Sequence, residues 1–405
     1  MPDTTADFPG LLRSARAMLP ELVTLRRRLH RRPEVGLELP ETRTAIAGEL
    51  RALGLDPRLG LTVSSVVAVL EGGLPGPTVL LRADMDALPL SEDTGLPFAS
   101  EVPGRMHACG HDTHMTMLIG GVRLLLERRA ALRGRVLLMF QPGEEGFFGA
   151  REMLTDGLLA TTDPAPTGAF ALHIGTNYPS GTISGRPGPM MAAADKLKIT
   201  IRGRGGHASM PQMALDPVPV AAEVILALQA MVTRTVDIFD PAVVTIAHIE
   251  AGFRDNIVPE TAFLEGTMRT LSETNRAGVQ ERIRRVVDGV CAAHGATAEV
   301  EIEAGYPVTV NDASFAPWAM GIARSLLGHA AVSEAPAPLM GAEDFSYVLQ
   351  RVPGSLFFIG ARPLELDPAT APMNHSNRVV YDEAAMASGA ALYAAIALEH
   401  AGRAG

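Results

Sequence analysis

The sequence predicts an α/β protein: a mostly parallel sheet, covered by helices on both faces, with an inserted α+β domain. Short apolar segments alternate with helical patterns over most of the chain, which is typical of a parallel sheet. The middle of the chain instead alternates apolar and polar residues, which is typical of an antiparallel sheet packed on helices. The 405 residues also exceed the roughly 250–300 at which one core stops growing, so two domains are expected.

The two ends of the chain supply the parallel-sheet domain. Apolar residues with the helical period mark its helices, and short apolar runs bounded by turn residues mark its strands. The predicted helices lie near 11–32, 41–53, 114–129 and 383–400, and the predicted strands at 78–84, 135–141, 168–174 and 355–359.

The inserted domain follows a segment rich in glycine and proline, 184–189. Its predicted strands lie at 196–202, 243–249 and 261–269, and its predicted helices near 217–232 and 274–294. We therefore assign residues 187–302 to this domain. Residues 1–186 and 303–405 form the discontinuous parallel-sheet domain.

Charge and cysteine content argue against several classes of protein. A net charge of −10 disfavours a nucleic-acid partner, and the basic run at 26–32 fits the solvated face of a helix. Two cysteines, Cys109 and Cys291, cannot form a disulfide framework. We find no signal peptide pattern and no apolar run of about 18 residues, so we expect a cytoplasmic protein without a membrane partner.

Side chains that could bind a metal or take part in catalysis follow three predicted strands. Asp84 and Asp86 end the first strand, Glu144 and Glu145 follow the second, and His173 ends the third. Ligands of open α/β sheets bind at the carboxyl ends of strands. The three strands are therefore expected to bring acids and an imidazole to one edge.

The segment 107–114 is the densest cluster of such residues. It contains three histidines, one cysteine and one aspartate within eight positions, and Cys109 and His111 are spaced to point to the same side. We favour a metal site over the alternative of a buried thiol among unrelated histidines. The spacing alone is only moderately specific, since it is not that of a zinc finger.

The adjacent carboxylates Glu144 and Glu145 need a cation or a proton between them. One of them can bind a metal while the other takes a proton from metal-activated water. The alternative is a helix start that simply favours acids. His375 in a late loop and His207 on a glycine-flanked turn are, taken singly, typical of surface histidines.

Taken together, these motifs resemble the metal-dependent amidohydrolases related to aminoacylases, which include hippurate hydrolases, N-acetyl-amino acid deacetylases and auxin-conjugate hydrolases. The resemblance covers nearly the whole chain, and the number and order of its motifs make it highly specific. The matching segments are 29–34, 82–89, 109–112, 144–145, 171–173, 203–209, 341–345 and 374–376. One departure, Leu39-Pro40 where the family usually has an acidic residue, lies outside the ligand set.

The resemblance implies a role for each candidate residue. Cys109 bridges two metal ions, His111 and His173 complete one metal site, and Glu145 and His375 complete the other. Glu144 is the general base and later the acid, and Asp86 orients a ligand. His207 polarises the scissile carbonyl. Asn256 and Arg269 lie near the carboxylate end of the substrate.

The implied reaction is hydrolysis of an N-acyl amino acid to a carboxylic acid and a free amino acid. The implied cofactors are two divalent ions, manganese or zinc, with cobalt or nickel as alternatives. A dipeptidase, a carboxypeptidase or an N-carbamoyl-amino acid hydrolase is the runner-up within this class. A cysteine-nucleophile hydrolase using Cys109 and an inactive binding protein are the rivals from other classes.

The resemblance also implies a homodimer formed by the inserted domain, which acts as a lid. His207 lies on that domain, so it serves either its own active site or that of the partner subunit. We favour the partner subunit.

Overall fold

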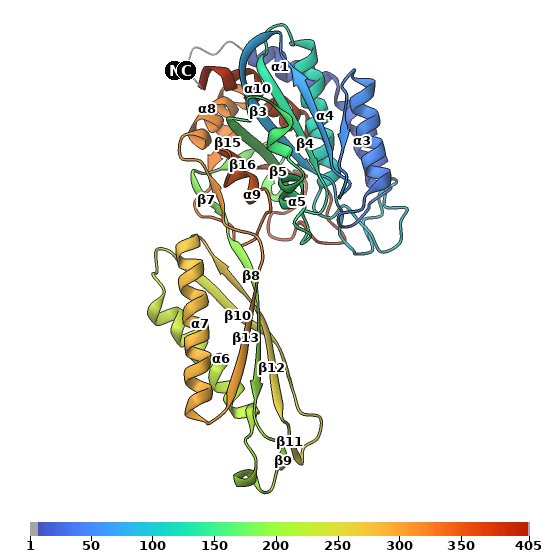
Figure 1. Ribbon diagram of the computed structural model, residues 1–405. Helices are drawn as coiled ribbons and strands as arrows, with labels where there is room; N and C mark the ends of the chain where they lie inside the picture. Colours follow the sequence, from blue (N-terminus) through green and yellow to red (C-terminus); the bar gives the residue numbers. More distant parts are fainter. Residues whose placement is uncertain (1–6, 404–405) are drawn as a thin grey trace. The chain divides into compact units, whose positions relative to one another are not determined.

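The computed structural model describes residues 7–403, which divide into two units (Figure 1). Unit 1 contains the chain up to Met190, together with Val310–Ala337 and the chain from Asp344 onward. Unit 2 contains Met191–Thr309 and Pro338–Glu343. The predicted borders lie at 187 and 302. In the structure the main segment of unit 2 ends at Thr309, beyond the last strand of its sheet, Thr297–Ala304 (β13).

Unit 1 is built on a large mixed sheet with the strand order β1-β2-β4-β3-β5-β16-β6-β15. Its centre is parallel, because β3 runs parallel to β4 and β5, and β16 runs parallel to β5. The predicted fold class, a mostly parallel sheet flanked by helices, is confirmed. The strands are Arg58–Leu59 (β1), Val66–Glu71 (β2), Leu74–Asp84 (β3), Arg133–Gln141 (β4), Gly168–Pro179 (β5), Ile183–Gly185 (β6), Val332–Glu334 (β15) and Gly354–Arg362 (β16).

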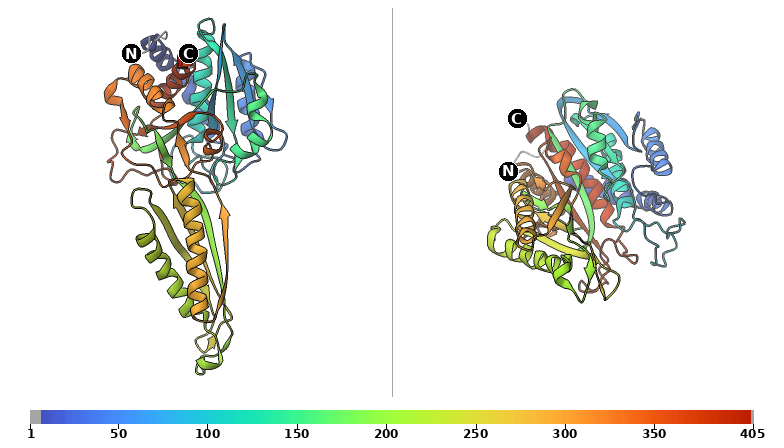
Figure 2. Two further views of the ribbon diagram at one scale, coloured as in Figure 1. Left: turned by 60° about the vertical axis from the view of Figure 1, so that its left-hand side comes forward. Right: turned by 60° about the horizontal axis from the view of Figure 1, so that its bottom comes forward.

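Helices cover both faces of this sheet. On one face, α4 and α10 lie side by side on the central strands and contact α1, α2 and α8 (Figure 2). On the other face, α5 packs on β4 and contacts α9. The helices are Phe8–Ala17 (α1), Leu19–His30 (α2), Pro40–Ala52 (α3), His111–Glu127 (α4), Gly149–Thr155 (α5), Phe315–Leu327 (α8), Ser346–Leu349 (α9) and Ala385–Arg403 (α10), with 3₁₀ turns at Leu158–Thr161 (η1) and His329–Ala331 (η3).

The core of unit 1 explains why its central strands consist of nearly unbroken runs of apolar residues. Successive side chains along a strand point to opposite faces of the sheet. Leu81 and Leu138 therefore join the core under α4 and α10, while Leu80 and Leu137 are buried on the other face. Burial on both faces requires apolar residues at nearly every strand position. Asp84, which is also fully buried, departs from this pattern at the end of β3.

Unit 2 is an antiparallel sheet with the order β10-β12-β8-β13 and two helices on one face. Alternate residues of β8, including Leu197, Ile199 and Ile201, point into the core under the helices. Its elements are Ala193–Arg202 (β8), Pro217–Thr235 (α6), Ala242–Ala251 (β10), Thr261–Thr270 (β12), Glu273–Ala293 (α7) and Thr297–Ala304 (β13), with the short pieces Gly206–His207 (β9), Pro211–Met213 (η2) and Ile257–Val258 (β11). The segments that join the units contain Gly188–Met191 (β7) and Thr309–Asn311 (β14), which pair with each other.

Capping residues set where the unit 2 helices begin. Asp216 accepts a hydrogen bond from the backbone N–H of Val218, and Ser272 accepts one from Asn275. By length and composition α6 alone, among the described residues, would suit a membrane span, with a mean hydropathy of 1.3. One such helix is weak evidence, and its buried face packs on the unit 2 sheet.

One predicted helix is in fact two. The segment 11–32 was expected to be continuous, but α1 ends at Ala17 and α2 begins at Leu19. Pro20 lies in the first turn of α2, where its missing N–H costs nothing, although it would break a continuous helix.

Candidate metal centre

The strand register of unit 1 sets up one polar edge. Asp84 at the end of β3 pairs with Gln141 at the end of β4, and β5 is the other parallel neighbour of β3. Glu144 and Glu145 follow β4 directly, and His173 lies on β5. Acids and an imidazole that are far apart in the sequence thus lie at one edge of the sheet.

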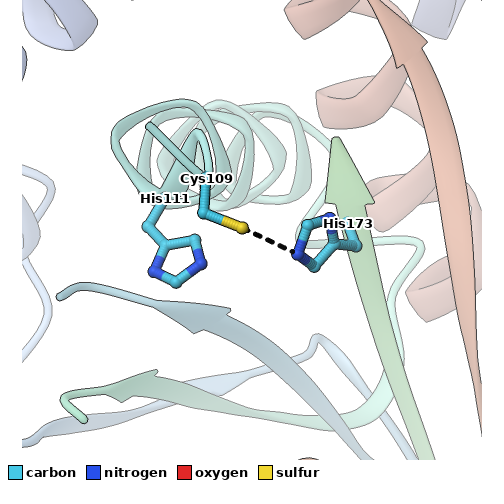
Figure 3. A group of neighbouring side chains, drawn as sticks. All are labelled: Cys109, His111 and His173. Carbon is cyan, nitrogen blue, oxygen red and sulfur yellow. Dashed lines mark hydrogen bonds between the residues drawn. The ribbon is translucent and has the colours of Figure 1, made fainter. Parts of the chain in front are cut away.

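The loop before α4 adds Cys109 and His111 to this edge. Gly110 between them has a φ of 80°, which favours glycine, and an added Cβ there would lie 2.3 Å from Cγ2 of Ile174. This close approach lets Cys109 point at His173 with His111 beside it (Figure 3).

Cys109, His111 and His173 form the first group of possible metal ligands. One donor atom from each lies within 4.8 Å of the others, and all three side chains are buried. Sγ of Cys109 is 3.4 Å from Nε2 of His173. Nδ1 of His173 is 2.8 Å from the carbonyl oxygen of Ile174, and its donation there leaves Nε2 directed at the thiol.

Cys109 also belongs to a second group, with Glu145 and His375. Oε1 of Glu145 lies 3.2 Å from Nε2 of His375 in an ion pair. His375 has a φ of 70°, which is uncommon for a residue other than glycine and typical of strained functional positions. The thiol of Cys109 is therefore shared by two sets of donor atoms.

Both ring nitrogens of the buried His111 lack a hydrogen bond of good geometry. The carboxylate oxygens of Asp84 and Asp86 lie 3.5 and 3.4 Å from them. Buried polar atoms nearly always have a partner, so these two nitrogens fit a site that holds a metal ion. A set of thiol, imidazole and carboxylate donors around such atoms fits a transition metal ion or zinc.

The protonation states agree with a site that exchanges protons for metal. Burial lowers the pKa of His173 to about 3, so its ring is neutral. Hydrogen bonds to Cys109 and Glu145 raise the pKa of His375 to about 10, and burial raises the pKa of the Cys109 thiol. Without metal, His375 and Cys109 hold protons at neutral pH that a bound cation would displace.

Asp86 fixes the turn that carries the two glutamates. Its carboxylate oxygens accept hydrogen bonds from the backbone N–H groups of Glu144 and Glu145, each at 3.0 Å. Oδ1 of Asp86 also lies 3.4 Å from Nδ1 of His111. Glu144 is 5% exposed and offers an oxygen within 4.8 Å of donor atoms of His111 and Glu145.

The remaining predicted residues, His207, Asn256 and Arg269, all belong to unit 2. His207 on β9 pairs with Ile257 on β11, and the backbone N–H of Ala208 donates to the carbonyl oxygen of Asn256. His207 and Asn256 line one surface hollow together with the exposed Phe253.

Arg269 lies apart from His207 and Asn256. Arg269 pairs with Ala194 and Val243 near the end of β12, whereas Thr261 begins that strand and pairs with Arg202, which precedes the His207 turn. Thr261 and Arg269 are about 27 Å apart along β12, at ~3.4 Å per residue. Its side chain is half buried, and burial lowers its pKa. The structure of unit 2 therefore does not bring Arg269 together with His207.

Some contacts of the site were not predicted. The side-chain amide of Asn374 donates to the carbonyl oxygen of Ile174 at 2.9 Å, and its nitrogen lies 3.8 Å from Sγ of Cys109. Asp84 contacts His114 at 2.5 Å. The sequence marked these residues only as members of motifs, because their partners lie far away along the chain.

The comparisons with known proteins agree with this geometry. Residues 80–399 match peptidase family M20/M25/M40. The chain belongs to this family. It is accordingly a metal-dependent hydrolase of amide bonds, and the resemblance inferred from its motifs is confirmed.

Individual relatives match over most of the M20-family chain. Thermostable carboxypeptidase 1 of Saccharolobus solfataricus is 39% identical, with 93% of this chain and 95% of the relative covered. N-acetylcysteine deacetylase of Bacillus subtilis is 38% identical, with 85% and 89% covered. A solved structure described as a dinuclear metal-binding peptidase of the M20 family, from Bacillus subtilis, has a TM-score of 0.82 at 34% identity, with 95% and 99% covered.

Proposed function

We propose that this protein is a binuclear amidohydrolase that converts N-acyl amino acids to a carboxylic acid and a free amino acid. The observation that carries the proposal is the sharing of the Cys109 thiol between two donor groups, with Glu144 beside them. A relative is named for deacetylation of N-acetylcysteine, which is a reaction of this class.

We assign one metal ion to Cys109, His111 and His173 and a second to Cys109, Glu145 and His375. Thiolate, imidazole and carboxylate ligands together suit manganese or zinc, with cobalt and nickel as alternatives. A metal-binding thiol also suits a reducing compartment, so we place the enzyme in the cytoplasm; both cysteines are free.

Glu144 is the general base in this proposal. When bound, divalent ions lower the pKa of water and polarise a carbonyl group. Glu144 takes the proton of the attacking water and later gives it to the nitrogen of the leaving amino acid. Asp86 holds Glu144 and Glu145 in place through their backbone N–H groups.

We assign the recognition of substrate in part to unit 2. His207 donates a hydrogen bond to the carbonyl oxygen as negative charge develops on it. Asn256 lies beside His207 and interacts with the carboxylate end of the substrate. Arg269 is a weaker candidate for that role, because it lies far from both along β12.

We further propose that unit 2 is a lid that forms a homodimer. Strand β10 is an edge strand with β12 on one side only, and such edges pair with other chains. Apolar side chains on this strand or just before it are exposed, among them Phe239 at 90%, Val243 at 40% and Ile249 at 56%. An edge strand that carries exposed apolar side chains is suited to pairing with a second copy of the chain.

A second candidate function is removal of a C-terminal amino acid from a peptide, which the name of the carboxypeptidase relative favours. The bond broken has the same chemistry, since an acyl carbonyl is joined to an amino acid nitrogen in both substrates.

A hydrolysis panel tests the proposal. Metal-loaded enzyme is incubated with N-acetyl, N-benzoyl and longer N-acyl amino acids and with dipeptides, with and without a chelator. We expect chelator-sensitive release of free amino acid from the N-acyl compounds. Faster cleavage of the peptides would favour the second candidate, and no chelator-sensitive release from any substrate would contradict both.

A further inference from the structure

Two buried residues beside the metal centre have no part in the proposed chemistry, Asp84 and His114. Both side chains are 0% exposed. Nδ1 of His114 lies 2.5 Å from Oδ1 of Asp84, and Nε2 of His114 lies 2.7 Å from the backbone nitrogen of Ile174. The ring thus joins a carboxylate at the end of β3 to the backbone of β5.

These contacts settle which nitrogen of His114 carries the proton. The backbone N–H of Ile174 can only donate, so Nε2 of His114 accepts. The proton then lies on Nδ1 and points at Asp84, which holds the ring in this form.

Ile174 connects this pair to a candidate metal ligand. Its carbonyl oxygen accepts the hydrogen bond from Nδ1 of His173, which leaves Nε2 of His173 directed at Cys109. The ring of His114 also packs against His173, with 4.9 Å between ring centroids, and stacks on His111 at 5.3 Å. His114 therefore contacts both histidines of the first group.

Asp84 is itself fixed to the frame of unit 1. Its Oδ2 accepts from Nη1 of Arg82 at 2.7 Å. Nε of Arg82 donates to Gln141 at 2.9 Å, and Asp344 accepts from the backbone of Ala150 and from Gln141. This buried network extends from β3 to β4 and α5.

We propose that Asp84 and His114 are a positioning pair that orients His173, through the backbone of Ile174, for the first metal ion. The proposal rests on the binuclear centre proposed above. Residues that orient a ligand histidine typically contribute about 10–100-fold to metal affinity. Asp84, His111 and His114 also form a group of possible ligands, but the oxygens of Asp84 already contact Arg82 and His114, which favours positioning over direct ligation.

Three substitutions of His114 separate its contacts. His114→Phe removes both hydrogen bonds and keeps a flat ring. His114→Asn keeps a donor near Asp84 but is too short to reach Ile174, whereas the longer amide of His114→Gln can accept from Ile174. The metal-free proteins are titrated with Co²⁺, and the cobalt–thiolate absorption is followed.

In the unmodified protein we expect two bound ions. In His114→Phe and His114→Asn, one ion should bind about 10–100-fold more weakly while the second is unaffected, because the ligands that His114 contacts, His111 and His173, both belong to the first ion. In His114→Gln most of the lost affinity should return. His400→Phe is the matched control, since it replaces a buried histidine of unit 1 whose contacts are with Thr167 and the rings of Phe315 and Trp318, and it should bind both ions normally.

Several results would overturn the proposal. Normal binding of both ions by a folded His114→Phe protein would do so. If His114→Phe does not fold, equal affinities in His114→Asn and His114→Gln would do so instead. Loss of an ion in Asp84→Asn with none in any His114 variant would make Asp84 a ligand. Failure of the unmodified protein to bind any ion would overturn the binuclear centre itself.

Discussion

The two adjacent glutamates have different neighbours despite their identical chemistry. Glu145 lies against His375 and shares a donor group with Cys109, whereas Glu144 does not belong to that group. Both backbone N–H groups donate to Asp86, which fixes the backbone of the turn that carries the two carboxylates. These contacts support the proposed division, with Glu145 as a metal ligand and Glu144 as the base.

Substitution of each glutamate should therefore have a distinct effect. Glu144→Gln should keep both ions while kcat falls about 10²–10⁴-fold, the usual contribution of a general base. Glu145→Gln should instead weaken one ion. Kinetics together with metal analysis of both variants measure this, and a Glu144→Gln enzyme that keeps most of its activity would show that the roles are wrong.

Sequence motifs were enough to nominate the residues of the centre but not their contacts. The cluster at 107–114 and the glutamate pair stand out because unusual residue types are adjacent. The contact of Asn374 with Cys109 joins positions 265 residues apart, and that of His114 with Asp84 spans 30. Such contacts depend on strand register and on the close approach at Gly110, which no local pattern records.

At the scale of the elements, long and strongly patterned segments were predicted well. The strand predicted at 135–141 lies within β4, and the helix predicted at 383–400 corresponds to α10. Short strands such as β6 and β15, with three residues each, were not predicted, because so few residues show no period.

The last turn of α10 gives a prediction about pH. Burial lowers the pKa of His400 to about 4, against about 6.5 in an unfolded chain. The unfolded state therefore binds the proton more readily, so stability is full above pH 6.5 and falls as the pH drops toward 4. At about 1.4 kcal/mol per pH unit, this one group costs at most about 3 kcal/mol.

His400→Phe should therefore remove part of this loss of stability at low pH. The free energy of unfolding, measured with urea between pH 7 and pH 4, should decrease less steeply in the variant than in the unmodified protein. His107 and His173 also have lowered pKa values, to about 3, so some dependence should remain. Equal slopes in the two proteins would show that His400 does not titrate as inferred.

At the scale of the whole molecule, the candidate residues are divided between the units. The proposed metal ligands and Glu144 belong to unit 1, whereas His207 and Asn256 belong to unit 2. The sequence predicted an insertion from its change of strand pattern, but the borders depend on how far β13 extends. In a dimer, the His207 of one subunit could act on substrate bound in its own unit 1 or in unit 1 of the partner subunit.

Mixed dimers test whether His207 acts in the partner subunit. Glu144→Ala and His207→Ala should each be nearly inactive alone. Co-expressed, they should recover part of the activity, because one site of each mixed dimer combines an intact Glu144 with the partner's intact His207. Verified mixed dimers that remain inactive would mean that His207 serves its own subunit.

If two ions held around Cys109 make this chain an amidohydrolase, its activity depends on how many ions are bound, and metal titration measures this most directly. Metal-free protein is mixed with increasing Mn²⁺ while release of an amino acid from an N-acyl amino acid is followed. We expect no hydrolysis without metal and a rise that levels off at two equivalents per chain, the number of donor groups that share Cys109. Full activity in verified metal-free protein would contradict the account.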